Sequence, residues 1–253
     1  METQLIPSIT GKQTDQWINH FWIDEMDSIL VTPYGLLMDD RKQIDRINVI
    51  ASQPFREIII DNCAFSIHRG YMKASEIERL MAQIKLAQIC NSDKITIVVP
   101  DFVQDFEKTM RSYRKLETIL RGVNHDRVRL MYVLQGTPLE MRQCFNYLET
   151  LPYPLDIAIA TQERSMNDLR AIKPMMVRAI ENYRVHLFGE TRDKTLKLLQ
   201  GAFNSYDTSK HFWDNWHNGF RGFELFERVA HSVANTLNSN YKQLNVLEYL
   251  EDL

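Results

Sequence analysis

The sequence has few cysteines, and they lack the spacing of metal sites or disulfide frameworks. Cys63, Cys90 and Cys144 form no Cys-x-x-Cys pair, so neither a zinc ribbon nor a disulfide scaffold is indicated. No His-x-His or His-Glu-x-x-His pattern occurs, and we favour structural roles for His68 and His186 over metal binding. We therefore expect no metal, no cofactor and a reducing compartment.

Long apolar runs and a strong net charge are also missing. No segment approaches the roughly 18 apolar residues that span a bilayer, and the start of the chain lacks the basic and apolar parts of a signal peptide. A formal net charge of -3 gives no whole-molecule attraction to nucleic acid or to an anionic membrane. These absences predict a soluble, cytoplasmic protein with no membrane partner.

What the sequence does contain is a repeated alternation of apolar strands and amphipathic helices. Strands are predicted at 28–33, 57–61, 94–99, 128–134, 156–160, 185–188 and 203–206. Helices are predicted at 40–51, 74–90, 103–121, 138–149, 166–181 and 191–200. Strands recurring every roughly 25 to 35 residues indicate βαβ units.

This alternation predicts an α/β protein with the (β/α)8 TIM-barrel fold, and a doubly wound open sheet is the alternative. No G-x-G-x-x-G or G-x-x-x-x-G-K-[ST] follows any predicted strand, which argues against the common nucleotide-binding open sheets. Only seven strands are visible. We expect one domain over 1–253, with 1–26 as an N-terminal lead-in and 222–253 as C-terminal helices.

Polar residues follow the predicted strands. They are Asp61, Asp101, Gln135, Thr161 and Asp207. In a barrel these positions converge on one rim, where active sites are built. Turn chemistry also enriches Asp after strands, and a single such residue is more often a helix cap than a functional group.

Five segments occur in the order and rough spacing of motifs in one enzyme family. They are Asp61-Asn62-Cys63-Ala64-Phe65, Pro100-Asp101, Val133-Leu134-Gln135-Gly136, His186-Leu187-Phe188-Gly189 and Gly201 to Asp207. Over roughly residues 28 to 245 the chain resembles the tRNA-guanine transglycosylase superfamily, and 235–241 resembles that family's C-terminal helix. The resemblance implies a barrel enzyme that exchanges guanine in a polynucleotide for a 7-deazaguanine such as 7-cyano-7-deazaguanine.

The resemblance also implies roles for single residues. Asp207 resembles the nucleophile, which attacks C1′ of the sugar and forms a covalent glycosyl-enzyme intermediate. Asp61 resembles the general acid/base that handles the protons of the leaving and incoming bases. Asp101 resembles the carboxylate that recognises N1 and the 2-amino group of guanine. This division of labour suits N-glycosidic bond cleavage, in which the sugar develops oxocarbenium character.

The remaining matched positions would bind the base. Gln135 and the Gly136 backbone would contact O6, and Phe65 and Phe188 would sandwich the ring. Stacking of this kind is worth about 1–3 kcal/mol per aromatic side chain. The target nucleotide would have to leave its stack to reach these groups.

The chain departs from the family pattern in several places. Asn62-Cys63-Ala64 replaces the Ser-Gly-Gly that normally follows the aspartate, and Ile159-Ala160 replaces a Gly-Gly pair. Ala160 and Thr161 would supply backbone contacts near the 7-substituent. The segment 208–213 replaces a Pro-Thr-Arg that helps to hold tRNA, and the Cys-x-Cys-x-x-Cys of the zinc-binding subdomain is missing.

These departures make the chain most similar to the zinc-free phage and bacterial DNA-guanine transglycosylases. We therefore expect DNA as the polynucleotide partner, with tRNA as an alternative, and a location in the host cytoplasm if the protein is phage-encoded. A catalytically silent barrel that binds a base or nucleic acid is a third interpretation. The sequence does not indicate an oligomeric state.

Three other signals have two interpretations each. A basic helix face could contact phosphates, but a solvated surface is favoured; it comprises Lys108, Arg111, Arg114, Lys115 and Arg121. The aromatic stretch of 212–217 could stack on bases or pack in the core. Cys63 could be a nucleophile, but packing is favoured.

Overall fold

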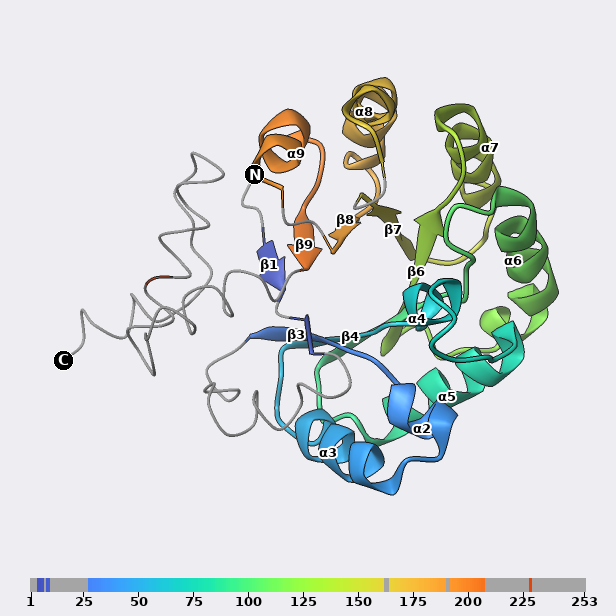
Figure 1. Cartoon of the computed structure of the whole chain (residues 1–253), viewed down its shortest axis with the longest axis vertical. Coiled ribbons are helices and arrows are strands. Elements are labelled where there is room, and N and C mark those ends of the chain that lie inside the picture. Colours follow the sequence, from blue (N-terminus) through green and yellow to red (C-terminus); the bar gives the residue numbers. More distant parts are fainter. Residues whose placement is uncertain are drawn as a thin grey trace.

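The computed structural model in Figure 1 describes residues 4–6, 8–9, 27–161, 164–189, 192–207 and 228. The segment 208–213, the aromatic stretch of 212–217 and, apart from residue 228, the predicted C-terminal helices lie outside these residues. None of the helices in the described ranges is long and apolar enough to cross a membrane.

The described chain folds into a mixed α/β structure around one parallel sheet. Its main strands are β3 (Ser28–Val31), β4 (Glu57–Ile60), β5 (Lys94–Val98), β6 (Val128–Leu134), β7 (Leu155–Ala160), β8 (Val185–Phe188) and β9 (Ser205–Asp207). These seven strands lie side by side in sequence order. A doubly wound sheet reverses its strand order part-way, so that alternative does not fit.

The N-terminal residues bring the two edges of this sheet together. Gln4–Ile6 (β1) pairs in parallel with β9, and Ser8–Ile9 (β2) pairs in parallel with β3. The seven-stranded sheet is therefore nearly closed and barrel-like. From the sequence, these residues were predicted to belong to a lead-in. The segment is short and partly polar and contains Pro7, so it shows no strand periodicity.

Most of the helices cover the outside of the sheet (Figure 1). They are α2 (Tyr34–Met38), α3 (Arg41–Ala51), α5 (Glu76–Ile89), α6 (Phe106–Arg121), α7 (Pro138–Leu148), α8 (Met166–Ala179) and α9 (Asp193–Leu199). The short helix α4 (Ala64–His68) lies inside the ring that they form. A capping box of Ser75 and Glu78 begins α5, and Pro138 is the first residue of α7. Helix α8 continues through Pro174.

Two apolar clusters hold the layers together. The larger one lies between the strands and the helices and includes Ile58, Ile60, Leu134 and Tyr206. The smaller one fills the inside of the barrel-like sheet and consists of Ile6, Leu30, Ile59, Val98, Met131, Val133 and Ala158. Because side chains alternate along a strand, every second residue of each strand faces this interior.

The same alternation brings charged side chains together near the amino-terminal ends of the strands. Arg184 pairs with Glu57, which also contacts Lys94 Nζ at 3.0 Å. Arg129 Nε lies 3.2 Å from Asp156 Oδ1. Burial alone would raise the pKa of Glu57, but the charges of Arg184 and Lys94 outweigh it and lower that pKa to about 2.

Candidate active site

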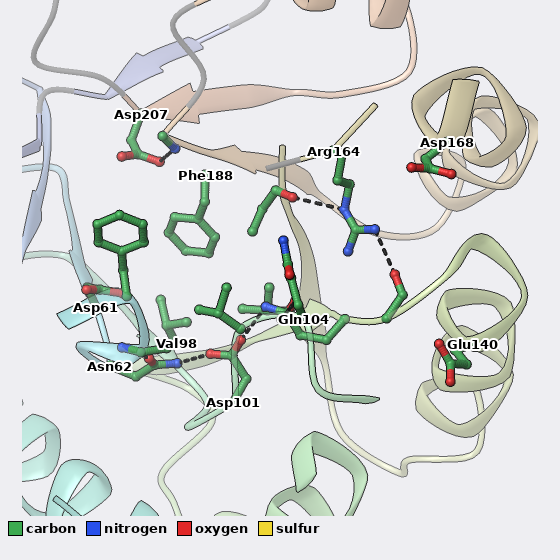
Figure 2. Close-up of a pocket in the computed structure, with 18 of the residues that line it drawn as sticks. Asp61, Asn62, Val98, Asp101, Gln104, Glu140, Arg164, Asp168, Phe188 and Asp207 are labelled. Atoms are coloured by element: carbon green, nitrogen blue, oxygen red, sulfur yellow. Dashed lines mark hydrogen bonds between the residues drawn. The ribbon is translucent and has the colours of Figure 1, made fainter. Parts of the chain in front are cut away.

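A cavity of about 670 Å³ opens at the carboxyl ends of the strands. The side chains that line it come from the loops after β4 and β5 and from the ends of β6 to β9. Figure 2 shows Asp61, Asp101, Phe188 and Asp207 around this space. Of the predicted site residues, all except Thr161 line it; they are Asp61, Phe65, Asp101, Gln135, Gly136, Ala160, Phe188 and Asp207.

Asp101 is held rigidly by two amide side chains. Asn62 Nδ2 donates to Asp101 Oδ1, and Gln135 Nε2 donates to Asp101 Oδ2, both at 2.6 Å. Gln135 Oε1 accepts a hydrogen bond from the Gln104 backbone N–H at 2.9 Å, which fixes the orientation of the amide. Burial raises the pKa of Asp101, against the lowering effect of these bonds and of the Arg79 charge.

Asp61 follows β4 directly and is only partly exposed. Its Oδ2 accepts a hydrogen bond from the Cys63 backbone N–H at 3.2 Å. Burial is the main cause that raises the pKa of Asp61 to about 6, and the nearby charges of Asp101 and Asp207 raise it further. Together they outweigh the hydrogen bonds from backbone N–H groups, which lower this pKa. A carboxyl group with a pKa near neutrality is suited to both giving and taking a proton.

Asp207 is the last residue of β9, and its side chain is 8% exposed. Its Oδ1 accepts from the Gly189 backbone N–H at 2.9 Å and lies 3.1 Å from His186 Nε2. Among the described residues, no hydrogen bond reaches Oδ2. One carboxylate oxygen is thus held in place, while the other is available to a ligand in the cavity.

Two aromatic rings complete the cavity wall. Phe65 is 44% exposed, and the Arg69 guanidinium lies 5.0 Å from the centre of its ring. Phe188 lies deeper, at the end of β8, with its ring edge-on to His186 at 4.8 Å between centroids. Two rings beside three carboxylates suit a flat ligand with several N–H donors.

No family model matches this chain. A search of curated proteins gives no match either.

Arg164 links the carboxyl ends of β6 and β7, and it was not predicted as a site residue from the sequence. Arg164 donates from Nε to Ala160 O at 3.0 Å and from Nη1 to Gly136 O at 2.7 Å. Gly136 has a φ of +90°, and a Cβ there would lie 2.6 Å from Glu140 Oε2. Thr161 is buried outside the cavity, and its carbonyl accepts from Arg192 Nη2 at 2.5 Å.

Cys63 is buried, and its burial is the main reason that the pKa of its thiol lies well above the ordinary value; the nearby Asp61 charge raises that pKa further. A thiol with so high a pKa does not suit a thiolate nucleophile.

On the basic helix face, Lys108, Lys115 and Arg121 pair with nearby carboxylates, as in a solvated surface. Within the described ranges, no group of three or more His, Cys, Asp or Glu residues could hold a metal ion.

The sequence analysis missed Asn62 and His186 as site residues. Asn62 was treated only as a departure from a family motif, although a polar residue beside a buried strand-end Asp is a natural hydrogen-bond partner. His186 was noted only as part of a family motif and as a histidine with a structural role rather than a metal ligand. The signal that identifies it is the strand alternation, which puts His186 on the same face as Phe188.

Proposed function

We propose that this protein is a guanine transglycosylase that exchanges guanine in DNA for a 7-deazaguanine base. The observation that carries the proposal is the meeting of Asp61, Asp101 and Asp207 with two aromatic rings in one cavity. We further infer a (β/α)8 barrel without a zinc-binding subdomain, in which β1 and β2 together supply the eighth strand between β9 and β3.

The two outer carboxylates suit the two halves of such an exchange. In the first half, Asp207 Oδ2 bonds to C1′ as the C1′–N9 bond breaks, and Asp61 gives its proton to the departing guanine. In the second half, Asp61 takes the N9 proton of the incoming base. N9 then bonds to C1′, and Asp207 leaves as a carboxylate. The pKa of about 6 for Asp61 lets one group serve in both directions.

The third carboxylate suits recognition of the base. Asp101 keeps lone pairs available after accepting from Asn62 and Gln135, and a carboxylate matches the adjacent N1–H and 2-amino donors of guanine. A base without these donors would leave a buried carboxylate unpaired, which is costly. Phe65 and Phe188 would stack on the two faces of the ring.

The decisive experiment supplies the protein with 7-cyano-7-deazaguanine and either double-stranded DNA or tRNA. After digestion, mass spectrometry of the nucleosides should find the 7-deazaguanine as a deoxynucleoside. Asp207→Asn should abolish the product, whereas Asp126→Asn, an exposed aspartate in the turn before β6, should not. Product in tRNA alone would replace DNA as the substrate, and product in neither, with base binding intact, would favour the silent barrel.

A further inference from the structure

His186 lies behind Asp207, in the interior of the sheet, and has no exposed surface. Strands β8 and β9 are paired so that His186 is opposite Ser205. Asp207, two residues after Ser205, faces the same side. The register therefore places the imidazole between a hydroxyl and a carboxylate: Nδ1 lies 2.9 Å from Ser205 Oγ, and Nε2 lies 3.1 Å from Asp207 Oδ1.

The groups at the two ends, Arg184 and Asp207, set the direction of these hydrogen bonds. Arg184 Nε lies 3.3 Å from Ser205 Oγ, and a guanidinium only donates. Ser205 Oγ therefore accepts from Arg184 and has its own O–H to give to His186 Nδ1. A hydroxyl could also accept a second hydrogen bond, so the deciding group is the Asp207 carboxylate, which only accepts. Nε2 therefore carries the ring proton and donates it to Asp207 Oδ1, and Nδ1 accepts from Ser205.

Asp207 Oδ1 consequently has two donors, the His186 ring and the Gly189 backbone N–H at 2.9 Å. The ring cannot easily turn away, because Phe188 packs against it edge-on, at an angle of 73° between the rings. The two bonds restrict rotation of the carboxylate of Asp207, a residue that lines the cavity.

We propose that His186 is a positioning residue for Asp207, in a directional relay from Arg184 through Ser205 and His186 to the carboxylate. The proposal rests on the proposed function in taking Asp207 as the nucleophile. When the C1′–Oδ2 bond forms, Oδ1 becomes the carbonyl oxygen of the ester and keeps both donors. When the incoming base displaces the ester, these donors stabilise the carboxylate that leaves.

Two substitutions separate this role from simple packing. A glutamine places its amide nitrogen near the position of the imidazole Nε2, so His186→Gln keeps a donor to Asp207. An asparagine reaches only as far as Nδ1, so His186→Asn keeps the contact with Ser205 and loses the one with Asp207. We expect His186→Asn to lower kcat by roughly 10–100-fold with little change in KM, and His186→Gln to be affected much less.

The matched control is His125→Gln. His125 stacks on Tyr153 and is not among the residues that line the cavity, so this variant should keep wild-type kinetics. If His186→Asn retained wild-type kcat, or if His186→Gln lost as much activity as His186→Asn, the positioning role would be wrong.

A second measurement does not depend on turnover. Nitrogen-15 NMR of the imidazoles reports which ring nitrogen carries the proton, and the signal absent from His186→Gln identifies His186 among the seven histidines. The relay predicts the proton on Nε2 in the wild type. A proton on Nδ1 would overturn the relay even if base exchange is observed. A wild-type protein that shows the Nε2 proton but no exchange would keep the relay and refute only the proposed function.

Discussion

Asn62 Nδ2 lies 2.6 Å from Asp101 Oδ1, although the two residues are 39 positions apart in the chain. The same Nδ2 donates to the Val99 carbonyl at 2.9 Å, so one amide ties the loop after β4 to the end of β5. The contact orients the carboxylate that we assign to base recognition.

Asn62→Asp tests that contact. It replaces the donor with a second carboxylate against Asp101, so we expect the free energy of unfolding to fall by about 1–3 kcal/mol at pH 8. Affinity for 7-cyano-7-deazaguanine should fall at least roughly tenfold, because the repelled Asp101 no longer keeps its orientation. Urea denaturation and calorimetric titration measure the two effects. Asn124→Asp, at an exposed turn, is the control, and equal losses in both variants would refute the assignment.

The two half-reactions should respond to pH in opposite directions. Formation of the glycosyl-enzyme needs protonated Asp61, so its rate should fall as pH rises through about 6. Attack by the incoming base needs ionised Asp61, so its rate should fall as pH drops through the same value. Single-turnover measurements from pH 4.5 to 8.5 would resolve the two steps. Rates that move together with pH would exclude Asp61 as the shared acid and base.

Ionised Asp61 should also lower the free energy of unfolding. Its pKa is raised from 3.8 to about 6 in the folded state, so the folded protein disfavours the ionised form. The cost is absent below about pH 4, grows through pH 6 and is complete above it. Asp61→Asn should therefore raise the free energy of unfolding by about 1–3 kcal/mol at pH 8 and by progressively less toward pH 4. A stabilisation independent of pH would contradict this explanation.

The exposed ring of Phe65 should contribute to base binding. Phe65→Ala is expected to weaken binding of the free base by about 1–3 kcal/mol, or roughly 5- to 150-fold, because one stacking face is lost. Tyr71→Ala removes a ring that is 67% exposed and is not among the cavity-lining residues, so it should leave the affinity unchanged. Equal effects of the two substitutions would mean that Phe65 does not contact the base.

The sequence predicted the strands well because their apolar runs are buried on both faces. Ile58 and Ile60 face the helices, whereas Ile59 faces the interior. Because both faces are buried, the sequence does not indicate which side of the sheet a residue faces. For this reason the contact between His186 and Ser205 was not predicted. The pairing of β1 with β9 depends on contacts about 200 residues apart, which local patterns do not encode.

The cavity was partly predictable for a similar reason. Parallel strands bring their carboxyl ends to one rim, so a polar residue directly after a strand, such as Asp61 or Asp101, is placed by topology alone. Thr161 follows β7 in the same way, yet its side chain is buried and its carbonyl is bound by Arg192. Only the packing of the loops decides whether a residue after a strand faces the ligand.

The proposed exchange requires that Asp207 become covalently attached to the sugar. Guanine-containing DNA mixed with the protein without an incoming base should give a denaturant-stable adduct. Protease digestion and mass spectrometry should locate the modification on Asp207, and Asp207→Asn should form none. An adduct attached elsewhere, or base exchange that continues in Asp207→Asn, would contradict the account.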